Sequence, residues 1–124
     1  MKTTTTFTAS IYVGMRERYT GEIRSIEMAR EALREYVKSG LCVTLTETEY
    51  IYTNGSEPGF IVGLINYPRF PASDQIIRTK ALEIAQDLLK LFHQGKVSVV
   101  FPDVTVMLEA EDDPTNPPCV TPIT

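Results

Sequence analysis

The chain has little of the side-chain chemistry that enzymes and metalloproteins usually gather in clusters. Its 124 residues include one histidine, two cysteines and no tryptophan. His93 alone cannot build a metal site of several histidines or a two-histidine acid–base pair, and its place at the end of a predicted helix favours a simple interaction with the helix dipole. Cys42 and Cys119 lie far apart without metal-ligand spacing, which indicates a reducing compartment and no disulfide framework.

Long hydrophobic runs and a surplus of positive charge are also missing. No apolar stretch is long enough to cross a bilayer, and the N-terminus has no positively charged segment followed by an apolar one. The sequence therefore predicts a cytoplasmic protein with no membrane partner. The formal net charge of -4 argues against long DNA or RNA as a partner, because such binding depends on clustered Lys and Arg. A small anion held by two or three arginines is compatible with this charge.

Sequence motifs of catalysis and phosphate binding are absent as well. The chain holds no Gly-x-Ser-x-Gly elbow, no Gly-x-x-x-x-Gly-Lys loop and no Gly-x-Gly-x-x-Gly. Carboxylates near predicted loops leave paired-carboxylate catalysis open, but their spacing singles out no pair. They are Glu17, Glu22, Glu47, Glu49, Glu57 and Asp103. The acidic run over 109–113 is better explained as a solvated segment than as a cation site. We therefore expect no enzymatic activity, no metal and no cofactor.

Strand and helix patterns follow one another clearly along the chain. Strands are predicted where apolar and polar residues alternate, and helices where apolar residues recur every three or four positions. Ser25 and Ser73 can cap the two helices. Gly40 can end the first helix, and the second is expected to end near His93 and Gly95. The predicted helices cover 25–38 and 73–93. The predicted strands cover 5–13, 41–52 with a bulge near 47–49, 60–67 and 97–101, and 104–108 either continues the last strand or forms a short fifth one.

This order, β-α-β-β-α-β, predicts an α+β fold in which two helices cover one face of a mostly antiparallel sheet. We expect one domain over 1–109, followed by an acidic and then proline-rich tail over 110–124. The face of the sheet away from the helices would carry small polar residues beside apolar residues of the third strand. Because this mixture suits neither water nor a core, we expect a second copy of the chain to cover it in a homo-oligomer.

The stretch 50–71 combines a predicted hairpin with an exit that is rich in binding groups. Asn54-Gly55 and Pro58-Gly59 suit a chain reversal between two apolar runs, and the second run is apolar toward both faces of the sheet, so both faces should be covered. The exit holds Asn66, Tyr67, Arg69 and Phe70. Aromatic rings can stack on a base, and arginine can bind a phosphate through two parallel hydrogen bonds. A strand end whose rings pack on the core explains the same residues equally well.

A second group of basic residues lies in the polar loop after the first predicted strand. Arg16 and Arg18 leave the end of that strand, where ligand loops are commonly built. With the exit of the third strand they predict a site for an anion that carries a ring. Arg78 and Lys80 on the second helix could join this site, although solvated helix positions explain them better.

Three runs of the sequence resemble the first class of Thoeris anti-defence proteins, which phages encode to counter the bacterial Thoeris system. The runs are Ile-Tyr-Val-Gly-Met-Arg-Glu-Arg-Tyr-Thr-Gly at 11–21, Tyr-Thr-Asn-Gly-Ser-Glu-Pro-Gly at 52–59 and Val-Gly-Leu-Ile-Asn-Tyr-Pro-Arg-Phe-Pro at 62–71. The resemblance extends from the first strand to about residue 109 and leaves out the tail.

Members of that family are small α+β proteins that oligomerise and hold cyclic ADP-ribose isomers made by TIR enzymes without cleaving them. The resemblance implies a sponge for glycocyclic ADP-ribose in the cytoplasm of the infected bacterium, a dimer or hexamer with its pocket between subunits. Some members also bind cyclic trinucleotides of the CBASS system, which leaves a second ligand site open here. Side-chain chemistry in this sequence, rather than the family's own contacts, assigns the pocket to Arg16, Arg18, Asn66, Tyr67, Arg69 and Phe70, with Thr115 and Asn116 of the tail as candidates for a lid.

Two other functions stay open at this point. A nucleotide-cleaving, phosphodiesterase-like enzyme would use a loop carboxylate and would show turnover. A protein–protein interaction module would use the strand edges and the tyrosine-rich hairpin, and no nucleotide would stabilise it against heat.

Overall fold

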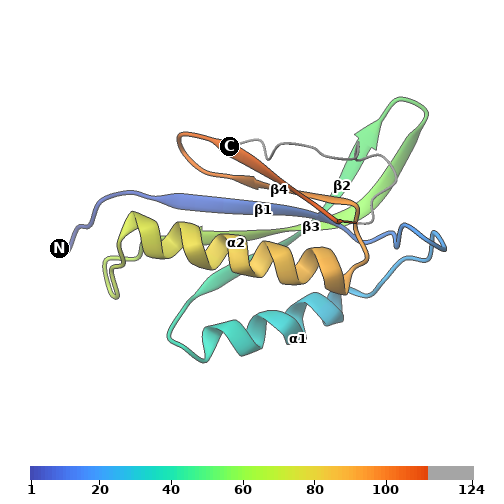
Figure 1. The fold of residues 1–124 in the computed structure, drawn as a ribbon. Coiled ribbons are helices and arrows are strands. Elements are labelled where there is room, and N and C mark those ends of the chain that lie inside the picture. Colours follow the sequence, from blue (N-terminus) through green and yellow to red (C-terminus); the bar gives the residue numbers. More distant parts are fainter. Residues whose placement is uncertain (112–124) are drawn as a thin grey trace.

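A computed structural model describes residues 1–111, which form one antiparallel sheet and two helices (Figure 1). The elements are β1 (Thr8–Gly14), α1 (Ile26–Val37), β2 (Val43–Tyr52), β3 (Gly55–Ile65), α2 (Asp74–Leu91), β4 (Lys96–Val100) and β5 (Thr105–Glu109). The strand order is β2-β3-β1-β4-β5 and each neighbouring pair is antiparallel. Both helices lie on the same face of the sheet, so the predicted α+β class is confirmed, and the residues after Val100 form a separate strand. Thr115, Asn116, Cys119 and the rest of the predicted tail from 112 on lie outside the described residues.

The helix starts follow from their serine caps. Ser25 Oγ accepts a hydrogen bond from the backbone N–H of Glu27, and Ser73 Oγ accepts one from Ile76, as predicted. Helix α2 ends just before His93, close to the predicted end. His93 takes the left-handed conformation, with φ 48°, and its backbone N–H donates to the Lys90 carbonyl. This places an imidazole at the C-terminal end of α2.

The core lies between α2 and the centre of the sheet. One stripe of α2 is buried against β1 and β4, and α1 adds a smaller contribution through Ala29 and Leu33. Each large apolar side chain buried there contributes about 1.5 to 3 kcal/mol. The buried residues of α2 are Ile77, Ala81, Ile84, Ala85, Leu88 and Leu89. Within residues 1–111, no helix combines the length and apolar character that crossing a membrane requires.

The β2–β3 hairpin turns earlier than predicted. Thr53 and Asn54 form the turn, with Asn54 at φ 65°, and Gly55 already pairs with Tyr52. Pro58 and Gly59 lie inside β3, and the pairing register runs without a break, so the predicted bulge near 47–49 is absent.

Gly59 is required by a close approach rather than by a turn. A Cβ there would lie 2.1 Å from Cε2 of Tyr50 and 2.5 Å from the Val13 carbonyl oxygen. The Tyr50 ring therefore crosses the strand at Gly59, and its hydroxyl donates to the carbonyls of Val13 (3.1 Å) and Phe60 (3.2 Å). Burial raises the pKa of Tyr50 to about 12.

The second face of the sheet is not covered by residues 1–111. Phe60, Val62 and Leu64 are buried under the helices, whereas Ile65 on the other side of β3 is 46% exposed. Both helices pack on one side of the sheet, so the described chain covers only one face of this strand. Cover of the other face by a second copy of the chain stays a prediction. Tyr12, Val100 and Met107 are other large apolar side chains exposed on this face.

Candidate functional site

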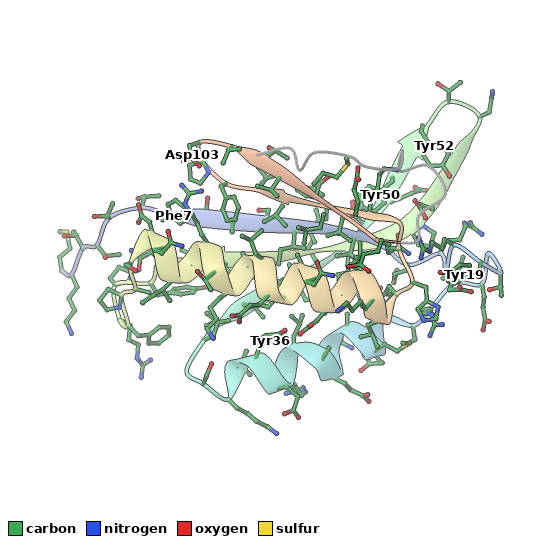
Figure 2. All side chains as sticks on the ribbon, in the orientation of Figure 1. Phe7, Tyr19, Tyr36, Tyr50, Tyr52 and Asp103 are labelled. Atoms are coloured by element: carbon green, nitrogen blue, oxygen red, sulfur yellow. The ribbon has the colours of Figure 1, made fainter. Side chains whose placement is uncertain are left out.

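The predicted binding residues fall into two groups at opposite ends of the sheet. Because β1 and β3 are antiparallel, Gly14 pairs with Gly59 while Ile65 pairs with Thr8. The loop after β1, with Arg16 and Arg18, therefore leaves one end of the sheet, and the segment after β3 leaves the other. Figure 2 shows this separation, with Tyr19 of the loop at one end and Phe7 at the other. A single chain does not bring the predicted constellation together.

At the β3 end, Asn66 is a structural residue within the chain. It is 6% exposed, and its Nδ2 donates to the Thr5 carbonyl at 2.8 Å and to Thr4 Oγ1 at 3.3 Å. Its Oδ1 accepts from the Ala72 N–H at 2.9 Å. The amide thus ties the N-terminal segment to the loop before α2, and its hydrogen-bonding atoms are used inside the fold.

The aromatic residues of the same segment face a small cavity of about 180 Å³. The Tyr67 and Phe70 rings lie 5.7 Å apart at a tilt of 54°. A hydrogen bond with the Cys42 side chain raises the pKa of the Tyr67 hydroxyl. Arg69 is exposed beside them. This end of the sheet offers stacking surfaces but little enclosed volume.

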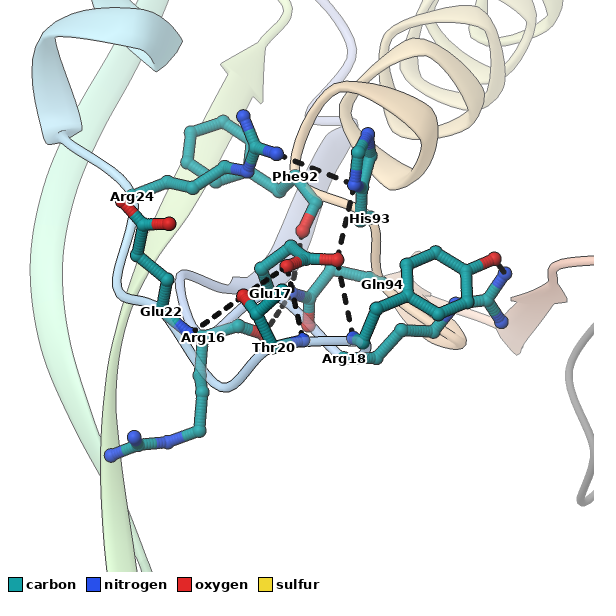
Figure 3. Close-up of polar contacts among 10 residues, drawn as sticks. Arg16, Glu17, Arg18, Thr20, Glu22, Arg24, Phe92, His93 and Gln94 are labelled. Carbon is teal, nitrogen blue, oxygen red and sulfur yellow. Dashed lines mark hydrogen bonds and ion pairs between the residues drawn. The ribbon is translucent and has the colours of Figure 1, made fainter.

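At the other end, the loop from Met15 to Arg24 folds back on itself and packs on the end of α2. Arg16 pairs with Ile23 in an isolated bridge, which closes the loop. The backbone N–H of Arg18 donates to the His93 carbonyl (3.2 Å), and Gln94 Nε2 donates to the Arg16 carbonyl (2.8 Å). Figure 3 shows these side chains gathered around Glu17. The backbone of the loop is thus hydrogen-bonded both to the backbone of His93 and to the side chain of Gln94, which fixes the position of the loop.

Glu17 is a buried carboxylate at the centre of this loop. Only 4% of it is exposed. Its Oε2 accepts from the hydroxyl and the backbone N–H of Thr20, and its Oε1 accepts from the Tyr19 N–H at 3.1 Å. These donors, the Thr20 hydroxyl first, and then His93, lower the pKa of Glu17 from 4.5 to about 2 against the opposing effect of desolvation. Glu17 therefore carries a full negative charge at neutral pH.

His93 completes the cluster from α2. Its Nδ1 lies 3.2 Å from Glu17 Oε1 and 3.3 Å from Nη2 of Arg24, and its side chain is 43% exposed. An arginine can only donate a hydrogen bond, so Nδ1 accepts one from Arg24 when the ring proton is on Nε2. When the ring proton is on Nδ1, Nδ1 donates to Glu17 instead. The buried anionic carboxylate favours the proton on Nδ1. Nε2, on the side of the ring away from Glu17, is then the free acceptor (Figure 3).

A cavity of about 460 Å³ lies beside this cluster. The Arg18 guanidinium lies 4.7 Å from the centroid of the Tyr19 ring and its Nη2 donates to the Tyr19 hydroxyl at 2.6 Å. The cavity is thus edged by an aromatic ring, by basic side chains, by the imidazole and by acidic side chains. The polar and aromatic lining includes Arg18, Tyr19, Lys90, His93, Glu109 and Glu111. Its volume and mixed charge suit a small polar molecule with a ring.

Sequence reasoning had named Arg18 but missed its partners in this site. Glu17 and His93 lie 76 positions apart, and no spacing rule links a loop carboxylate to a histidine at the end of a distant helix. The one available signal was that both lie at element ends. Helix α2 runs in the same direction as β1, so the end of β1 and the end of α2 meet at one end of the sheet. Among residues 1–111, no three His, Cys, Asp or Glu side chains are arranged to hold a metal ion.

Comparison with known proteins finds relatives of the fold. No family model matches the sequence, and no curated protein matches it. A solved structure of a phage SAM lyase in the apo state superposes with a TM-score of 0.70 at 17% identity, covering 85% of this chain and 90% of that one. A phage SAM lyase in complex with S-methyl-5'-thioadenosine gives a TM-score of 0.71 at 16% identity, covering 86% of this chain and 92% of that one.

This likeness overturns the expectation that the chain is not an enzyme. The neighbours that share its α+β architecture over most of both chains are lyases. The missing sequence motifs had suggested an absence of catalysis, but solved proteins of this fold are enzymes. At such low identity the likeness is one of fold, and in fold this chain is similar to phage SAM lyase.

Proposed function

We propose that this chain binds a small adenine nucleoside or nucleotide in the cavity beside Arg18 and Tyr19, and so withdraws it from the host of a phage. The observation that carries the proposal is the pairing of Arg18 with the Tyr19 ring at the edge of a cavity of about 460 Å³. A ring of this kind stacks on a base, and the guanidinium binds phosphate or carboxylate. The fold neighbour in complex with S-methyl-5'-thioadenosine supports an adenosine-bearing ligand.

Within this class, the ligand we propose is a cyclic ADP-ribose isomer made by a TIR enzyme. Run 11–21, one of the three that resemble Thoeris anti-defence proteins, supplies the loop with Arg18 and Tyr19. Arg18 and Lys90 are two cations for the two phosphates of such a ligand. Capture of the ligand would block Thoeris signalling. Cyclic trinucleotides of the CBASS system remain candidates for a second site.

We also propose that the chain acts as a homo-oligomer. The sheet face with Ile65 and Met107 is exposed in the described chain, and a second copy would cover it. In such a homo-oligomer, the end of the sheet that carries Arg18 in one copy could lie beside the end that carries Tyr67 in another copy. Residues that one chain holds apart could then meet at one ligand.

A second candidate ligand is S-adenosylmethionine or a related sulfonium nucleoside. The specific observation in its favour is the charge of the cavity, since Glu109 and Glu111 line it together with Arg18 and Lys90. A zwitterionic ligand can pair its negative group with the two basic side chains and its positive group with the two glutamates, whereas a diphosphate can pair only with the basic side chains. The lyase neighbours point the same way.

Calorimetry with both ligands tests the proposal. We expect one of them to bind, and a tight ligand at a hundredfold excess over its Kd to stabilise the protein by about 2.7 kcal/mol. Heating the complex and assaying the filtrate then gives the fate of the ligand. Intact nucleotide would mean capture, and a new product would mean turnover. Absence of heat and of thermal shift with both ligands would contradict the proposal and favour a protein–protein module.

A further inference from the structure

We infer that Glu17 is a positioning residue for ligand capture, because its buried carboxylate holds the loop with Arg18 and Tyr19 in the binding conformation before the ligand arrives. This inference rests on the proposed nucleotide binding and assigns a role within that site. Glu17 does not itself contact the ligand, since it is only 4% exposed and its oxygens accept hydrogen bonds from the loop.

The carboxylate of Glu17 lies inside the turn that it stabilises (Figure 3). Its Oε1 accepts from the backbone N–H of Tyr19 at 3.1 Å, and its Oε2 accepts from the N–H of Thr20 at 3.2 Å and from the Thr20 hydroxyl. The Thr20 hydroxyl in turn accepts from the Glu22 N–H at 3.2 Å. Hydrogen bonds to a charged acceptor are about twice as strong as neutral ones. The network therefore fixes the backbone on both sides of Tyr19.

The base of the loop is closed by contacts of its own. The Glu17 N–H donates to the Glu22 carbonyl at 2.7 Å, and the Gly21 N–H donates to the Glu17 carbonyl at 2.8 Å. Arg16 Nη1 donates to the Gly21 carbonyl at 3.2 Å, so a residue that the sequence assigned to the ligand pocket stabilises the loop instead. With Gln94 holding the Arg16 carbonyl, the base is anchored to the end of α2, and Glu17 orders the tip.

The two side chains proposed to bind the ligand depend on this backbone for their positions. Arg18 lies over the Tyr19 ring, and that ring meets the His93 ring edge-on with centroids 6.0 Å apart. All three line the cavity. A buried carboxylate is stabilised only where donors surround it, and three of these donors belong to the loop tip. The charge of Glu17 thus favours one conformation of the loop. A loop that had to order on binding would bind more weakly, in proportion to the time it spends in the wrong conformation.

Binding kinetics separate a positioning residue from a direct contact. The probe is the purified nucleotide product of a TIR enzyme, measured on the immobilised full chain. Glu17→Gln replaces one accepting oxygen by an NH₂ group, which cannot accept from the loop donors. We expect kon to fall about tenfold while koff stays unchanged, because only a fraction of the variant is then in the binding conformation. Arg18→Ala removes a contact to the ligand and should instead raise koff.

Thr20 offers a matched pair of variants at an exposed position. Thr20→Val removes the hydroxyl donor at nearly the same volume and should lower kon in the same way. Thr20→Ser keeps the hydroxyl and should restore kon to the wild-type value. Thr79→Val, the same change at an exposed position of α2, should leave kon unchanged. The Thr20 pair also carries the test if Glu17→Gln does not fold.

Hydrogen exchange of the ligand-free protein gives a readout that needs no ligand. The Tyr19 and Thr20 amides should exchange about tenfold faster or more in Glu17→Gln and Thr20→Val than in wild type, while the Ile11 amide in the centre of β1 stays protected. Equal exchange in all three proteins would overturn the inference, as would a Glu17→Gln variant with raised koff and unchanged kon. Failure of the wild-type protein to bind the nucleotide would overturn the proposed ligand, and the exchange rates would still decide whether Glu17 fixes the loop.

Discussion

Arg78 Nη2 donates a hydrogen bond of 2.6 Å to Asp103 Oδ2 and joins α2 to the turn between β4 and β5. The same guanidinium lies over the Phe7 and Phe101 rings, 4.7 and 4.9 Å from their centroids. The sequence analysis had interpreted Arg78 as a solvated cation or a ligand contact, and in the structure it covers the edge of the core.

Replacement of Arg78 by alanine should lower the free energy of unfolding by about 1 to 2 kcal/mol, the sum of two cation–π contacts and one partly exposed ion pair. Urea denaturation measures this difference. Arg34→Ala, the same change on the exposed face of α1, is the matched control and should cost less than about 0.5 kcal/mol. Equal effects of both changes would show that the stacking on Phe7 and Phe101 contributes nothing.

The lowered pKa of Glu17 makes stability depend on acid pH. In the folded protein this pKa is about 2, below the ordinary value of 4.5, so the contribution of Glu17 is fully present above pH 4.5 and is lost as pH falls toward 2. Glu17→Gln should therefore be less stable than wild type at pH 7, and the difference should shrink between pH 4.5 and 2. Urea midpoints across this range measure it, with Glu35→Gln as the control. A difference that stays constant with pH would mean that the carboxylate charge is not what the Thr20 and Tyr19 donors stabilise.

Local patterns predicted the elements of this fold well. The three- and four-residue spacing of apolar residues in α2, and serine at both helix starts, depend on neighbours in sequence, and the structure reproduces them. The hairpin at Asn54 was predicted, but the start of β3 was placed too late because Pro58-Gly59 is typical of a turn. Here the glycine instead makes room for the Tyr50 ring, a contact that local sequence does not reveal.

The site was harder to predict than the fold because it depends on strand direction. Arg16 and Arg69 were grouped since both follow a strand, yet the antiparallel pairing of β1 with β3 sends them to opposite ends. Likewise, the sequence predicted only an interaction of His93 with the helix dipole, because no residue near His93 in the sequence indicates its contact with Glu17.

Two arginine variants distinguish a site within one chain from a site between chains. Arg18→Ala should weaken nucleotide binding by about 1 to 3 kcal/mol, since it removes a charged hydrogen-bond donor from the cavity. Arg69→Ala should do the same only if a second copy brings its β3 end to the ligand. Calorimetry with both variants measures this. Unchanged affinity in Arg69→Ala would remove Arg69 from the site, and unchanged affinity in Arg18→Ala would place the ligand elsewhere.

Lysine substitutions on the uncovered sheet face test the proposed assembly. Ile65→Lys and Met107→Lys place a charge on side chains that are 46% and 44% exposed, so a monomer should tolerate them. In a homo-oligomer built on this face they should lower the mass found by size exclusion with light scattering, because an interface does not accommodate a buried unpaired charge. Ile76→Lys, at a 52% exposed position of α2 on the helical side, should leave the mass unchanged. A monomeric mass for the wild-type protein at micromolar concentration would contradict the assembly.

Asn66 variants should act on stability rather than on ligand binding. Replacement by alanine leaves the Thr5 carbonyl and the Ala72 N–H without their partner in a site that is 6% exposed. Because an unsatisfied buried group costs about 1 to 3 kcal/mol, Asn66→Ala should lower the free energy of unfolding by at least that amount. Asn66→Asp keeps the acceptor for the Ala72 N–H but places a buried carboxylate against the Thr5 carbonyl oxygen, so at neutral pH it should destabilise the protein at least as much as alanine. Urea denaturation gives the stability of each variant, and calorimetry on the folded fraction gives its affinity. A variant of wild-type stability that had lost nucleotide affinity would return Asn66 to the ligand contacts that the sequence had predicted.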